Sequence, residues 1–69
     1  MSFTVEIASV LDRDDLVAEI WLGDAIVAEL HRDNGKIKVD IYRNESGQPW
    51  CFDLSDWLAV LSEAQRKLG

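Results

Sequence analysis

Acidic side chains are the most abundant reactive groups in this sequence, with 13 Asp and Glu residues among 69. Paired carboxylates can carry out acid–base chemistry when one raises the pKa of the other. Glu29 and Asp40 are predicted to face each other across a hairpin, and Glu19 joins them in one register of a second hairpin. A minimal enzyme that uses these three residues is therefore one hypothesis. Since Lys38 lies diagonal to Glu29 and opposite His31, a solvent-facing mosaic of charges is the simpler interpretation.

Other catalytic and metal-binding patterns are absent from the sequence. His31 and Cys51 are the single residues of their types and form no HxxxH or CxxC pair, so neither a metal site nor a cofactor is expected. The acidic run 12–15 lacks the frame and the closing Glu of a calcium loop, which favours a solvated turn. Cys51 lies between two aromatic residues and is expected to be a buried, unreactive thiol. The chain is therefore predicted not to be an enzyme.

Composition excludes several further classes of function. The formal net charge of −6 opposes contact with nucleic-acid phosphates or anionic lipid. Acidic residues interrupt the apolar stretches, so no segment approaches the roughly 20 apolar residues that span a bilayer. The first residues lack the basic region of a secretory signal, and a single cysteine fits a reducing compartment. We expect a cytoplasmic protein that binds neither membranes nor nucleic acid directly.

Asn34-Gly35 is the clearest structural signal, because this pair can take both positive-φ positions of a type I′ turn. Apolar residues alternate with polar ones on both sides of it, which is typical of half-buried strands. A two-residue turn here places Leu30 opposite Val39, and this register keeps the apolar side chains on one face. The sequence therefore predicts a β-hairpin.

A second hairpin is predicted at residues 23–24, where the sequence permits two registers. A two-residue turn would pair Leu22 with Ala25 and place Glu19 on the core face. A three-residue connection would pair Leu22 with Ile26 and leave Glu19 outside. We prefer the second register, because burying an unpaired carboxylate costs several kcal/mol whereas a less common turn costs about one or two.

The C-terminal part of the chain changes to helical periodicity. Leu54, Trp57, Leu58 and Leu61 recur at i, i+3, i+4 and i+7, which predicts an amphipathic helix that Asp53 or Ser55 can cap. Residues 1–69 form one domain, with strands at about 3–10, 16–22, 25–32 and 36–43, a short strand or covering segment at 50–52, and a helix at about 54–68. The predicted fold class is α+β, an antiparallel β-meander of four or five strands packed on one face by the C-terminal α-helix. We expect the helix stripe to pack on residues 37, 39 and 41 and the facing strand residues.

The outward face of the predicted sheet is the candidate binding surface. In the preferred register Val27 lies between Trp21 and Tyr42, and in the alternative register Ile20 replaces Trp21. Aromatic side chains within a polar rim are typical of protein interfaces. The predicted protein-binding residues are Trp21, Val27, Glu29, His31, Asp40 and Tyr42.

These observations predict a small acidic, non-catalytic protein-binding module. Its partner is expected to be a second copy or a larger protein, because a chain of this size has little stability of its own. Residues 12–33 contain seven acids and two basic residues, whereas residues 36–43 contain three basic residues and one acid. An alternative function is therefore an acidic inhibitor of a nucleic-acid-handling enzyme, of the immunity-protein, antitoxin or phage-encoded antagonist type, in which an acidic lobe occupies a basic groove.

Overall fold

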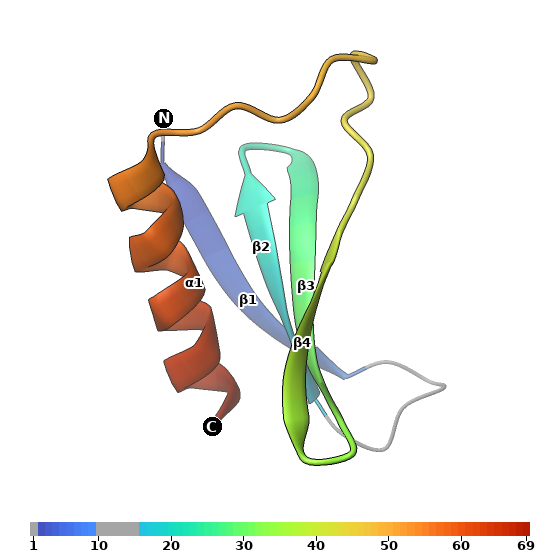
Figure 1. Cartoon of the computed structure of the whole chain (residues 1–69), viewed down its shortest axis with the longest axis vertical. Helices are drawn as coiled ribbons and strands as arrows, with labels where there is room; N and C mark the ends of the chain where they lie inside the picture. Colours follow the sequence, from blue (N-terminus) through green and yellow to red (C-terminus); the bar gives the residue numbers. More distant parts are fainter. Residues whose placement is uncertain (1, 10–15) are drawn as a thin grey trace.

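The computed structural model of the chain describes residues 2–9 and 16–69 and contains one antiparallel sheet and one helix. The elements are β1 (Phe3–Ser9), β2 (Leu16–Leu22), β3 (Ala25–Asp33), β4 (Lys36–Ile41) and α1 (Leu54–Leu68). The strand order is β1-β2-β3-β4, so the predicted α+β meander with a C-terminal helix is confirmed (Figure 1). In this described part, the segment 50–52 forms no fifth strand. The predicted acidic turn at 12–15 lies outside the described residues.

The hairpin of β3 and β4 is the one that the sequence predicts. Asn34 and Gly35 have φ angles of 55° and 77°, the positive values that a type I′ turn requires. Leu30 is the register partner of Val39, as predicted. The face that carries Leu30 and Val39 is therefore mainly apolar, and the opposite face carries the polar pairs of Glu29 with Asp40 and His31 with Lys38.

The hairpin of β2 and β3 contains both registers that the sequence permits. The turn has two residues, so Leu22 pairs with Ala25 and the expected three-residue connection is wrong. A β-bulge after Ile20 then shifts the pairing, so that Ile20 lies opposite Ala28. This shift places Glu19 on the outward face, as the preferred register required. The bulge thus reconciles a tight turn with the high cost of burying a carboxylate.

The core lies between α1 and the first three strands. Its buried members are Ala18, Ile20, Val27, Ala28, Leu30, Val60 and Ala64. At one end, Phe52 packs edge-on to Phe3 and stacks on Trp57, with ring centroids 5.0 and 5.1 Å apart. The segment 50–52 therefore covers the core without joining the sheet. Cys51, which lies between Trp50 and Phe52 in the sequence, is exposed, so the prediction of a buried thiol is wrong.

Helix α1 packs mainly on β1 and β2 and lies away from β4 (Figure 1). The expected contact of its stripe with the apolar residues of β4 is therefore wrong. Val60 and Ala64 are buried, whereas Leu58 is 56% exposed and Leu54 is 68% exposed. The helix is turned so that the Leu54 and Leu58 side chains remain outside the core.

The two ends of α1 follow the sequence signals. Asp53 is the N-cap, and its carboxylate accepts a hydrogen bond from the backbone N–H of Asp56 at 3.3 Å. The hydrogen bond that the Ser55 hydroxyl donates to Asp53 lowers the pKa of this carboxyl, and the bond from Asp56 lowers it further. Gly69 ends the helix at a φ of 94°. Within the described residues, no helix has the length and apolar character needed to cross a membrane.

Replacing Gly35 by valine tests the turn that sets the β3–β4 register. Gly35→Val should lower the free energy of unfolding by at least about 1 kcal/mol, because a β-branched residue resists positive φ. No atom lies within 4 Å of the position a Cβ would take, so the loss would come from the backbone alone. Urea denaturation measures it. Asn34→Gly is the matched control and should change stability little, since glycine also suits this turn position. Equal stability of Gly35→Val and the wild type would contradict the turn assignment.

Candidate functional site

A row of four carboxylates crosses the outward face of the sheet, which is the face turned away from α1. Glu6 is the register partner of Glu19, Glu19 of Glu29, and Glu29 of Asp40, so each strand contributes one acid. Like charges directly opposite each other destabilise a sheet. The sequence predicts that Glu19, Glu29 and Asp40 lie together, but it does not place Glu6, because residues 10–15 contain no turn motif that would set the register of β1. The row is a site where positive charge would be stabilising.

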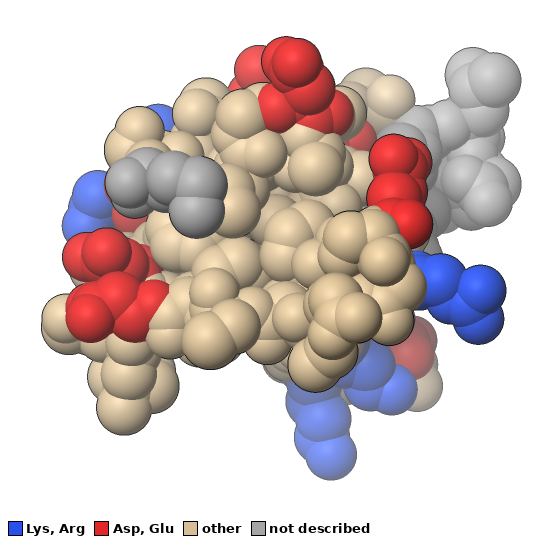
Figure 2. Space-filling model, turned by 90° about the horizontal axis from the view of Figure 1, so that it is seen from above, with Lys and Arg blue, Asp and Glu red and all other residues tan. Residues whose placement is uncertain are grey.

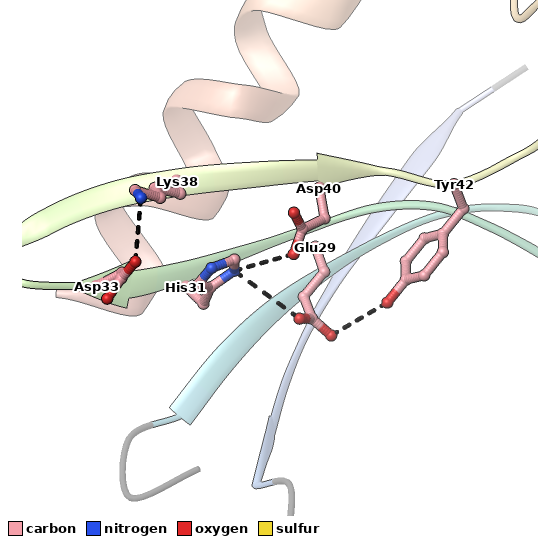
Figure 3. Close-up of polar contacts among 6 residues, drawn as sticks. All are labelled: Glu29, His31, Asp33, Lys38, Asp40 and Tyr42. Carbon is pink, nitrogen blue, oxygen red and sulfur yellow. Dashed lines mark hydrogen bonds and ion pairs between the residues drawn. The ribbon is translucent and has the colours of Figure 1, made fainter. Parts of the chain in front are cut away.

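The centre of this row is unusually well shielded from water. The side chains of His31 and Glu29 are 9% and 12% exposed, whereas that of Asp40 is 58% exposed. His31 Nδ1 lies 3.3 Å from Asp40 Oδ2 and 4.0 Å from Glu29 Oε2 (Figure 3). Lys38, the register partner of His31, is turned away and binds Asp33 at 3.0 Å. His31 therefore faces two carboxylates.

Two aromatic side chains donate hydrogen bonds to the row. The Tyr42 hydroxyl donates to Glu29 Oε1 at 3.3 Å, and Trp21 Nε1 donates to Glu19 Oε1 at 3.2 Å. Partial burial raises the pKa of Tyr42, and the negative charge of Glu29 and its hydrogen bond raise it further. Smaller contributions come from the charges of Asp40 and Glu19. The pKa of the Tyr42 phenol is therefore sensitive to the negative charge of the row.

The predicted aromatic row differs from the structure at its central residue. Val27 is fully buried and belongs to the core cluster, so its expected exposure between Trp21 and Tyr42 is wrong. Because the register of β2 and β3 shifts at the bulge, Trp21 pairs with Ile26 and not with Val27. Trp21, Ile26, Tyr42 and Trp50 line part of a hollow of about 760 Å³ beside the β2–β3 turn. Viewed from the end that carries the 42–53 segment, the middle of the surface is uncharged and acids lie at its margin (Figure 2).

A second surface, which sequence reasoning missed, lies on the core-facing side of β4. Ile37, Val39 and Ile41 are 36%, 45% and 60% exposed. With Leu58 and Leu61 of α1, the first two line a groove of about 370 Å³. The number of strands could have indicated this surface, since one helix is too narrow to cover four strands.

The free edge of β4 also exposes backbone hydrogen-bonding groups. The Tyr42 N–H donates to the Val27 carbonyl of β3 at 2.8 Å. In an antiparallel ladder alternate residues direct their N–H and C=O groups to the same side. Ile37, Val39 and Ile41 therefore direct theirs away from β3, toward the open edge. An added strand would find these groups ready to pair.

Comparisons with known proteins give no match: no family model, no curated protein and no solved structure matches the chain. No residue role is therefore transferred from a relative. Function has to be inferred from the acidic row on the outward face and from the apolar edge at β4.

Titration of the phenol tests the electrostatics of the acidic row. Tyr42 is the single tyrosine, so the ultraviolet absorbance of the phenolate reports it alone. Its pKa should lie above 10.0 and should fall in Glu29→Gln, because that variant removes the nearest negative charge. Since folding raises this pKa, the associated stability should be lost as pH rises from the unfolded value through the folded one. Glu63→Gln on α1 is the control. A Tyr42 pKa that is the same in Glu29→Gln and the wild type would show that the two groups are not coupled.

Proposed function

We propose that this chain is a small, non-catalytic protein-binding module that forms a homodimer through the β4 edge. The observation that carries the proposal is the complementary arrangement of charge about Val39. Lys38 precedes Val39 and Asp40 follows it, with Ile37 and Ile41 beyond them. An exposed lone cysteine suits a reducing compartment, and we propose the cytoplasm as the location.

Charge complementarity selects a second copy as the occupant of this edge. When two β4 strands pair antiparallel about a two-fold axis at Val39, Lys38 of each copy lies opposite Asp40 of the other. The symmetry makes two such pairs. Opposite charges in facing positions stabilise a sheet by about 0.2–1 kcal/mol per pair. Both side chains are about half exposed and lie on the outward face, so they can meet without losing all their water.

The same two-fold axis also pairs the free backbone N–H and C=O groups of the two β4 edges. Val39 would face Val39 of the second copy, and Ile37 would face Ile41. These are the residues whose N–H and C=O groups point to the open edge, so each facing pair can exchange two hydrogen bonds. A register shifted by one residue would place groups that already bind β3 at the interface and would lose these bonds.

The apolar side chains also favour association. Ile37, Val39 and Ile41 stand on the core-facing side, and in the dimer each would contact a copy of this set. Natural proteins protect exposed edge strands with charge, bulges or covering elements. On β4 the charged residues lie on the outward face, and the three aliphatic residues on the other face stay exposed. Pairing two copies would join the two sheets into one and remove this edge.

A larger partner would have a different surface available. The hollow lined by Trp21, Ile26, Tyr42 and Trp50 lies at the end of the sheet, beyond the residues that face the second copy. Aromatic residues in a hollow with a polar rim are typical of the centre of a protein interface. We therefore propose that this hollow stays accessible in the dimer and binds a further protein.

Charge reversal tests the dimer. In Lys38→Asp, an acid would lie opposite Asp40 of the second copy at both symmetric positions, and the dissociation constant should rise at least about tenfold. Asp40→Lys should weaken the dimer similarly. The double variant, Lys38→Asp with Asp40→Lys, restores opposite charges and should restore the dimer. Sedimentation velocity over a range of concentrations measures all three.

Arg66→Asp is the matched control, because it makes the same change of charge on the exposed side of α1. It should leave the dimer intact, and circular dichroism should show that every variant is folded. A wild-type chain that stays monomeric at millimolar concentration would contradict the proposal. A double variant as weak as the single ones would contradict the proposed register.

The acidic row supports a second candidate function, binding to a basic groove of another protein. Glu6, Glu19, Glu29 and Asp40 form a line of negative charge across the whole sheet. Such a line could occupy a site that normally receives a nucleic-acid backbone.

Ionic strength separates the two candidates. Near 1 M salt the Debye length falls to roughly 3 Å, so an acidic inhibitor should release a captured basic protein. The homodimer should persist, because screening also reduces the repulsion between two chains of net charge −6. Capture from a host extract at low and high salt, with dimerisation measured in parallel, distinguishes the outcomes. Capture that does not respond to salt would contradict the inhibitor hypothesis.

A further inference from the structure

We infer that Glu29, His31 and Asp40 form a binding site for a divalent first-row transition-metal ion, with Zn²⁺ as the representative ligand. One oxygen or nitrogen atom from each residue lies within 4.8 Å of the other two. The residues come from neighbouring strands β3 and β4 and point toward one another (Figure 3). The inference does not depend on the dimer, because all three ligands belong to one chain.

The buried imidazole nitrogen is the observation that points to a ligand. Among the described side chains, His31 Nδ1 is the buried polar atom that lacks a hydrogen-bond partner. It lies 3.3 Å from Asp40 Oδ2, yet the two atoms are not oriented for a hydrogen bond. A buried nitrogen without a partner is costly, and few native groups remain in this state.

The distances explain why a cation suits this arrangement better than a hydrogen bond. Two ligand atoms that each lie about 2.1 Å from a tetrahedral metal ion are about 3.4 Å apart. Both atoms then point at the ion between them and not at each other. Nδ1 and Asp40 Oδ2 already have nearly this separation, at 3.3 Å. Glu29 Oε2 lies 4.0 Å from Nδ1 and within 4.8 Å of the Asp40 ligand atom, so its side chain would move inward when an ion binds.

The surrounding charges also favour a dication. Glu19 is the register partner of Glu29 and adds a third carboxylate beside the two ligands. The nearest basic side chain on this face, Lys38, is held by Asp33. Tyr42 donates to the other oxygen of Glu29 and so fixes the orientation of that carboxylate. The site thus combines excess negative charge with an oriented ligand.

The mixed donor set predicts which ions bind. Imidazole nitrogen suits Zn²⁺, Co²⁺ and Ni²⁺, whereas Mg²⁺ and Ca²⁺ prefer sites made of oxygen atoms alone. Asp40 is largely exposed, so water can complete the coordination shell. We therefore expect Zn²⁺ and Co²⁺ to bind and Mg²⁺ not to bind at the same concentration.

Nuclear magnetic resonance of the imidazole ring tests the site directly. His31 is the single histidine, so its ring signals are unambiguous. Titration with Zn²⁺ alone should shift these signals and saturate at one ion per chain, whereas Mg²⁺ should leave them unchanged. Asp40→Asn should raise the dissociation constant at least about tenfold. His31→Gln should abolish the one-site binding heat in calorimetry.

Asp24→Asn is the matched control. Asp24 is an exposed acid in the β2–β3 turn and does not belong to the ligand cluster. This variant removes the same charge and should change the dissociation constant less than about twofold. Ring signals that do not respond to millimolar Zn²⁺ would overturn the inference and leave only the close contact of His31 with Asp40. Equal weakening by Asp24→Asn and Asp40→Asn would also overturn it, because it would show diffuse attraction to an acidic surface.

Discussion

The difference in width between one helix and four strands determines which surfaces of this molecule are exposed. An α-helix is about 10 Å across, whereas four strands spaced about 4.8 Å apart span roughly 14 Å between the outer strands. Helix α1 packs mainly on β1 and β2, so the core-facing side of β4 has no cover. The exposure of Ile37, Val39 and Ile41 follows from this geometry, since the two-residue period of a strand places them on the same face as the buried Leu30.

The β-bulge between β2 and β3 has the corresponding effect on the outward face. Without it, the tight turn after Leu22 would direct Glu19 into the core, where an unpaired carboxylate would be costly. The shift returns Glu19 to the outward face and aligns it with Glu6 and Glu29. The acidic row is therefore a result of relieving an unfavourable burial. It in turn creates repulsion between facing carboxylates, which a metal ion or a basic partner would offset.

Local signals explain how much of the fold could be predicted. Asn34-Gly35 specifies its turn through backbone preference, and the period of the apolar residues defines the helix at 54–68. The bulge could not be predicted, because the tight turn at 23–24 and the outward position of Glu19 require different registers. The pattern of polar and apolar residues does not show that one strand can adopt both. The face of α1 was predicted in part. Trp57 and Leu61 pack against the core as expected, but Leu58 is exposed and Val60 is buried, because tertiary packing sets the rotation of the helix about its axis.

The candidate sites were predictable to the extent that they depend on register. Glu29 and Asp40 were expected to face each other, and they do. The burial of the His31 side chain and the missing partner of Nδ1 depend on side-chain packing in three dimensions, which a single sequence does not reveal.

Strand β4 carries both proposed surfaces, and the turn at Asn34-Gly35 positions them together. Residues 37, 39 and 41 supply the apolar side and the open backbone groups, while 38 and 40 supply the charges of the outward face. A slip of one residue in the pairing with β3 would exchange the two sets and would separate Asp40 from Glu29. Dimer edge and metal site should therefore be lost together when the turn is disturbed. Asp40 takes part in both, as a metal ligand and as the residue opposite Lys38 of the second copy, so its substitution should weaken both. A substitution of Val39 on the core-facing side should affect the dimer alone, because it leaves the backbone register and the three metal ligands intact.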